Sequence, residues 1–92
     1  EKKESYTSEE SFIIFPVPVQ QGILKITPLL KNEKTNCQIE ISDLYGKAIY
    51  LSEIEFYNNI SHSIDLSHAA PGTYVLVIKT PSGKIRKAII LQ

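Results

Sequence analysis

The chain has 92 residues, of which 42% are hydrophobic and 22% charged, with a single cysteine and no methionine. This length fits one domain, and this composition is that of a folding chain rather than one held open by charge repulsion. Ten basic and ten acidic residues cancel, which excludes the single-sign field that attracts nucleic acid or an anionic membrane. One cysteine cannot form an internal disulfide, and a start at Glu1 without an initiator methionine predicts a piece of a longer precursor.

The first segments divide the chain into a linker and a folded domain. Residues 1–11 are charged and hydroxylic without strand or helix periodicity, so we expect a flexible linker there and a domain over residues 12–92. Phe12 to Phe15 predicts a short strand that ends at Pro16 and Pro18, because proline fixes φ and lacks an N–H group. After a turn, Ile23 to Thr27 predicts a second strand.

A β-hairpin is expected in the middle of the chain. Lys31 to Asn36 is a polar loop, and Cys37 to Ser42 then alternates apolar and polar residues, the signature of a half-buried strand. In the turn that follows, Asp43 is suited to cap the start and Gly46 to adopt a positive φ. Ala48 to Leu51 returns as the partner strand.

The second half of the chain predicts three more strands and an ambiguous region. Ser52 to Ser63 is interpreted as a short edge strand and a loop, because two consecutive asparagines interrupt it. Ile64 to Leu66 predicts a strand, Thr73 to Lys79 a central strand with two apolar faces, and Lys84 to Leu91 the last strand. About seven short strands at this spacing predict an all-β fold, an immunoglobulin-like antiparallel β-sandwich.

The residue types of metal and catalytic sites are present but not at useful spacings. Cys37 alternates in phase with the apolar residues of its strand, as a buried structural thiol would. No cysteine or histidine pair has metal-ligand spacing, and no serine has a nucleophile-elbow context. The sequence therefore predicts no catalytic residue, no metal, no cofactor and no enzymatic activity. The residues considered are Cys37, Asp43, His62, Asp65 and His68.

Two features near the C-terminal end leave alternatives open. Tyr74 follows Gly72 just inside the strand after a long crossover, the position of a tyrosine corner whose hydroxyl bonds to the crossover backbone. The alternative is an ordinary core tyrosine. The last fourteen residues contain four bases and no acid, which is either the solvated face of a terminal hairpin or a recognition patch. These bases are Lys79, Lys84, Arg86 and Lys87.

Three segments carry recognisable motifs. Phe15 to Ile26 contains an aromatic-Pro-x-Pro opening and the strand after it, and Ile39 to Lys47 is a strand ending in Asp-Leu-x-Gly-Lys. Ile64 to Leu91 contains a Gly-x-Tyr strand and a terminal lysine-rich strand. These segments, in this order, resemble the type A C-terminal sorting domain of the bacterial type IX secretion system, whose opening has asparagine between the two prolines and whose later strand reads Leu-x-x-Gly-x-Tyr. The structural motif residues are Pro16, Pro18, Asp43, Gly46, Gly72 and Tyr74.

The resemblance implies a role in secretion. It implies an upstream passenger that crosses the periplasm of a Gram-negative bacterium and then the outer membrane, because the translocon recognises this domain. A sortase would cut in residues 1–11 and join the passenger to anionic lipopolysaccharide at the cell surface. The terminal hairpin would carry the recognition signal, since an open strand edge can be recognised by strand addition. The residues implied are Gly83, Lys84, Arg86, Lys87, Ile89, Ile90 and Leu91.

One departure from the family pattern supports an alternative role. Val17 stands where the family has asparagine, which removes a side chain able to close an Asx-type turn. The alternative is a retained domain of a secretion or surface-attachment component that docks to partners or binds anionic lipopolysaccharide. A further alternative is a generic immunoglobulin-like adhesin or spacer module.

Overall fold

The computed structural model describes residues 12–15, 22–29, 34–57, 60–81 and 83–92. Within these ranges the chain forms seven strands and no helix, so none of the described residues belongs to a helix able to cross a membrane. The predicted linker and the proline bend at residues 16–18 lie outside the described residues. The strands are β1 (Phe12–Phe15), β2 (Ile23–Pro28), β3 (Lys34–Asp43), β4 (Ala48–Tyr57), β5 (His62–Asp65), β6 (Gly72–Thr80) and β7 (Gly83–Leu91).

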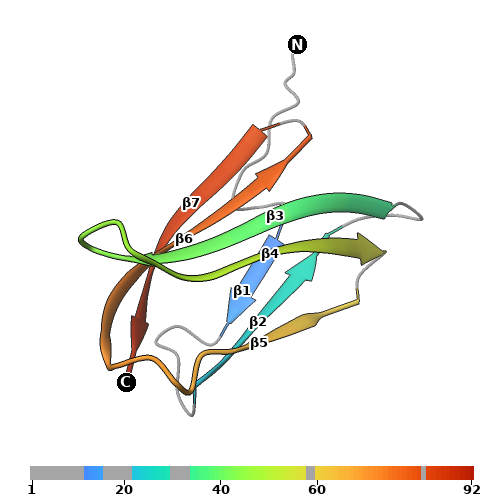
Figure 1. Cartoon of the computed structure of the whole chain (residues 1–92). Helices are drawn as coiled ribbons and strands as arrows, with labels where there is room; N and C mark the ends of the chain where they lie inside the picture. The colour runs from blue at the N-terminus through green and yellow to red at the C-terminus, as the bar shows by residue number, and fades with distance from the viewer. Residues whose placement is uncertain (1–11, 16–21, 30–33, 58–59, 82) are drawn as a thin grey trace.

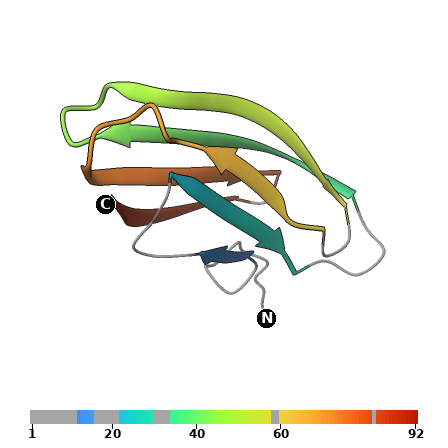
Figure 2. The same cartoon turned by 90° about the horizontal axis from the view of Figure 1, so that it is seen from below.

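The strands form two antiparallel sheets, in the orders β1-β2-β5 and β4-β3-β6-β7 (Figure 1). In Figure 2 the three-stranded sheet lies against one face of the four-stranded sheet. The predicted all-β sandwich is therefore confirmed. The other face of the four-stranded sheet is not covered by any described strand. This is why β4, β3, β6 and β7 alternate between buried and more exposed residues.

The core forms between the inner faces of the two sheets. Phe56 of β4 is central to it, with its ring centroid 5.5 Å from that of Phe12 and 6.1 Å from that of His62, both edge to face. Both sheets contribute apolar side chains because each strand turns every second residue inward. The buried residues are Phe12, Leu24, Ile26, Cys37, Ile39, Ile41, Ile54, Phe56, Ile64, Leu66, Tyr74, Leu76, Ile78, Ile85, Ile89 and Leu91.

The central hairpin is longer than the sequence predicted. The polar loop expected to extend to Asn36 was wrong, because β3 already begins at Lys34. Ser52 to Ser63 was interpreted as a short edge strand and a loop. An edge strand is present there, but it is the unbroken continuation of β4 to Tyr57, and β5 already begins at His62. The reason is cross-strand pairing, which joins Lys34 to Tyr57 and supports two segments that look irregular when each is considered alone. The Lys34 ammonium lies 5.9 Å from the centre of the Tyr57 ring, which adds a cation–π contact to this end.

Gly22 joins the start of β2 to the crossover between β5 and β6. The Leu66 N–H donates to the Gly22 carbonyl at 2.6 Å, and Gly22 has a φ of 76°. A Cβ atom on Gly22 would lie 2.6 Å from the Cα of Ser67. The two segments therefore approach so closely that only glycine fits.

Candidate functional site

β7 is an edge strand of the four-stranded sheet. It pairs with β6 along its whole length, from Gly72↔Leu91 to Thr80↔Gly83, and with no other described strand. Figure 1 shows the two strands as a hairpin that ends at the C-terminus of the described chain. The backbone groups on the far side of β7 therefore have no strand partner within the described ranges, and another strand can pair with them.

The outward-facing residues of β7 are basic at one end and apolar at the other. Lys84 and Arg86 are exposed near the β6–β7 turn, and Ile90 is exposed near the opposite end. Gly83 is exposed at the turn itself, where its carbonyl accepts a hydrogen bond from the Thr80 hydroxyl at 3.1 Å. These four residues of the implied recognition signal lie on the surface of the folded domain.

The inward-facing residues of β7 belong largely to the core. Ile89 and Leu91 are buried together with Ile85, so their side chains are not available to a partner while the domain is folded. Lys87 stands between Ile85 and Ile89 on the same inner face and is half-buried. The implied recognition residues therefore divide into an exposed set, Gly83, Lys84, Arg86 and Ile90, and a buried set, Ile89 and Leu91. A partner can contact the buried set only through its backbone.

Lys79 of β6 extends the basic end of the outer face. It pairs with Lys84 across the hairpin, and Val77 pairs with Arg86 two residues farther from the turn. Within the described residues, Lys79, Lys84 and Arg86 form no ion pair with an acidic side chain. Three cations that form no ion pair with any described acidic residue thus gather on the β7 side of the outer face.

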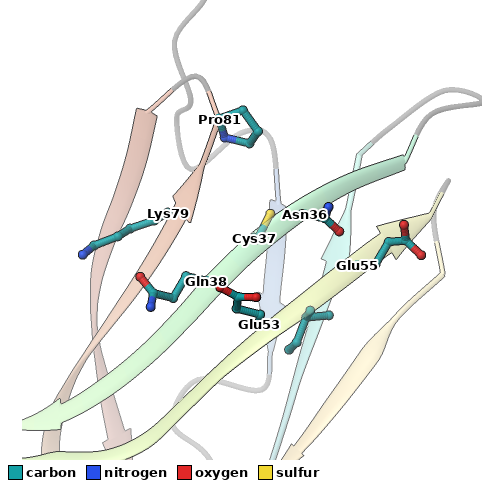
Figure 3. A pocket seen from close by; sticks show the side chains of 8 residues that line it. Asn36, Cys37, Gln38, Glu53, Glu55, Lys79 and Pro81 are labelled. Atoms are coloured by element: carbon teal, nitrogen blue, oxygen red, sulfur yellow. The ribbon is translucent and has the colours of Figure 1, made fainter.

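Acidic side chains occupy the other end of the same face. Glu53 and Glu55 of β4 are exposed, and Gln38 of β3 pairs with Glu53 on one side and Lys79 on the other. Figure 3 shows these side chains around a hollow of about 720 Å³, with Gln38 between Lys79 and Glu53. Sequence reasoning missed this acidic edge because it interpreted Ser52 to Ser63 only as a short edge strand and a loop, without joining it to the strand before it. The alternation of two glutamates with two buried apolar residues from Glu53 to Phe56 was the available signal.

The chemistry-bearing residues singled out from the sequence do not form one site, although Asp65 and His68 interact electrostatically. Cys37 is buried, and burial raises the pKa of its thiol to about 11, so the thiol stays protonated at neutral pH. Hydrogen bonds from the side chain and backbone of Ser67 lower the pKa of the Asp65 carboxyl, with a smaller contribution from His68. Among the described residues, no group of three His, Cys, Asp or Glu side chains could hold a metal ion.

The motif residues within the described ranges have structural roles. Asp43 closes its turn, because its Oδ1 accepts hydrogen bonds from the backbone N–H groups of Tyr45 and Lys47, each at 2.9 Å. Gly46 follows in that turn with a φ of 90°. The turn presents Tyr45 with 97% of its surface exposed.

Tyr74 has the geometry of a tyrosine corner. Its side chain is buried, and its hydroxyl donates to the Ala70 carbonyl in the crossover at 2.6 Å. Gly72 lies between these two residues in an exposed position at the start of β6. The hydrogen bond fixes the crossover against β6, the strand that pairs with β7.

Comparison with known proteins identifies the family. Residues 13–92 match the family model described as the secretion system C-terminal sorting domain, and no curated protein sequence matches the chain. The chain belongs to this family, whose domain is the C-terminal sorting signal of type IX secretion. Membership implies interaction with the type IX secretion machinery and export to the cell surface or the extracellular space. It also favours a sorting role over a generic spacer module.

Proposed function

We propose that the type IX translocon recognises this domain by adding a strand to the free edge of β7. The observation that supports the proposal is the combination of an edge that has no strand partner among the described residues with exposed cations at one end of it. Backbone hydrogen bonds give such pairing its affinity, and the outward side chains set the partner and the register. Lys84 and Arg86 select an acidic partner strand, and Ile90 contacts an apolar group at the other end.

A secretion assay tests the role of this edge. A reporter fused upstream of residues 1–92 is produced in a Gram-negative bacterium that carries the type IX system, and the exported fraction is measured. The variant K84E/R86E is expected to reduce export severalfold because each substitution reverses an exposed charge beside the edge. K25E/K47E changes the net charge equally at exposed positions elsewhere and serves as the control. Unchanged export of folded K84E/R86E would exclude recognition through these side chains.

The fate of the passenger is a separate part of the proposal. A sortase cuts the precursor within residues 1–11 and joins the passenger to anionic lipopolysaccharide. Typical cargo proteins that end in a domain of this family are processed in the same way. Mass spectrometry of the surface-exposed reporter is expected to find a new C-terminus in this segment and an attached lipopolysaccharide fragment. A reporter that reaches the surface with the whole domain still joined to it would contradict this part alone.

A retained lipopolysaccharide-binding domain is the second candidate. The supporting observation is that Lys79, Lys84 and Arg86 gather on one face without ion pairs among the described residues. Purified anionic lipopolysaccharide should then bind the isolated chain, and K84E/R86E should abolish the binding. No binding by the unmodified chain at low salt would remove this candidate. In either role the domain acts by recognition and carries out no reaction of its own.

A further inference from the structure

We propose that the free edge of β4 pairs with the free edge of β7 of a second copy of this chain. The domain then associates head to tail through one continuous antiparallel sheet. This inference goes beyond the sorting role, because it concerns two ends of the same sheet and a partner identical to the chain itself.

The order of the strands permits this pairing. Among the described strands, β4 and β7 are the two edges of the four-stranded sheet, and every neighbouring pair in that sheet is antiparallel. β4 and β7 therefore run in opposite directions, so a copy placed beside the sheet presents β4 antiparallel to β7. The contact joins two different edges, so it is heterologous. An assembly of any length keeps an unpaired β7 at one end and an unpaired β4 at the other, and further copies can add there.

One register matches the outward-facing residues of the two edges. It sets Glu53 opposite Arg86 of the second copy and Glu55 opposite Lys84. The same register sets Leu51, an exposed apolar residue, opposite Ala88. Each acidic side chain of β4 thus meets a basic side chain of β7, and directly opposed pairs of opposite charge stabilise antiparallel strands.

The same register also matches the inward-facing residues. It sets Ile54 opposite Ile85 of the second copy, and both side chains belong to the core of their own domain. It sets Tyr50, which packs partly against the core, opposite Ile89. Apolar residues therefore oppose apolar residues on the inner face of the joined sheet, as acidic residues oppose basic residues on its outer face.

Lys87 distinguishes this partner from other strands. A lysine that points inward from an edge disfavours pairing with a strand whose opposing residue is apolar. In the matched register Lys87 stands opposite Ser52, which is small and polar. Self-pairing of like edges lacks this match: β4 against β4 about Ile54 opposes Glu53 to Glu55. β7 against β7 about Ile85 likewise opposes two cations.

Sedimentation velocity of the purified chain across a wide concentration range tests the pairing. The weight-average mass is expected to rise beyond that of a dimer, because each copy offers both edges, and to fall as salt screens the charge pairs. The variants E53K/E55K and K84E/R86E should each weaken association by about tenfold or more, since attractive pairs become repulsive. An equimolar mixture of the two variants should restore association, because each supplies the edge that complements the other.

Two further measurements separate edge pairing from general charge attraction. K25E, which alters an exposed lysine of β2 in the other sheet and so away from both edges, should associate as the unmodified chain does. The variant L51C/A88C retains all the charges and is expected to form a ladder of disulfide-linked species under mild oxidation, because the register brings these two positions together. A chain that remains monomeric at millimolar concentration, or a mixture that fails to restore association, would overturn the proposal. Both proposals use the edge of β7, and E53K/E55K separates them, because it should weaken association while it leaves β7 unchanged for recognition in the export assay.

Discussion

Substitution of Gly22 by alanine should destabilise the domain more than the same substitution at Gly46. Both glycines have a positive φ, 76° and 90°, so alanine at either position is strained by about 1–2 kcal/mol. At Gly46 a Cβ would have nothing within 4 Å, whereas at Gly22 it would lie 2.6 Å from the Cα of Ser67. This second clash involves backbone and adds about 1–3 kcal/mol by overpacking. We therefore expect a loss of about 1–2 kcal/mol for G46A and about 2–5 kcal/mol for G22A.

Urea denaturation followed by circular dichroism measures both values, and linear extrapolation gives the free energy of unfolding. A difference of 1 kcal/mol corresponds to about 4–8 °C in Tm for a domain of this size, so thermal melting is a second readout. Gly46→Asn serves as the control for strain, because asparagine tolerates positive φ, and it should retain most of the stability. Equal losses for G22A and G46A would refute the close approach of the β2 start to the crossover.

Three further predictions concern single side chains. Tyr74→Phe should cost about 1 kcal/mol in the free energy of unfolding, because the hydrogen bond to Ala70 is lost while the ring remains. The pKa of Cys37 is raised from 9.0 to about 11, so the unfolded state loses its proton first, and stability should fall as pH rises from 9 to 11. Alkylation of this thiol should be slow until denaturant is added. The pKa of Asp65 is lowered by its hydrogen bonds to Ser67, so its NMR titration midpoint should lie below that of the unfolded chain. Its contribution to stability is present above the unfolded pKa and is lost as pH falls through the folded value.

The sequence predicted best where local chemistry and tertiary structure agree. Cys37 to Ser42 alternates with a period of two, and the structure buries its apolar members on one face of β3. Asp43 and Gly46 carry the geometry of their turn within five residues, so no distant contact is needed to recognise it. Tyr74 was recognisable from its place after the crossover.

The prediction failed where structure depends on a distant partner. Lys34 to Asn36 has no apolar alternation, and these residues are strand only because they pair with Glu55 to Tyr57. Cross-strand pairing is a property of two segments, so neither segment alone reveals it. The candidate site shares this limit, because the acidic edge of β4 can be recognised only once the strand is known to continue past Leu51.

The four terminal bases, which the sequence presents as one group, have two different physical roles in the fold. Lys79, Lys84 and Arg86 face outward, where a partner can contact their charges directly. Lys87 faces inward from the same edge and is half-buried between apolar neighbours. A partner that reads only surface charge would respond to the first three and not to Lys87, whereas a partner that adds a strand must also place a residue opposite Lys87. Binding by strand addition at β7 should therefore depend on which residue of the partner lies opposite Lys87, whereas binding by simple electrostatic attraction should not.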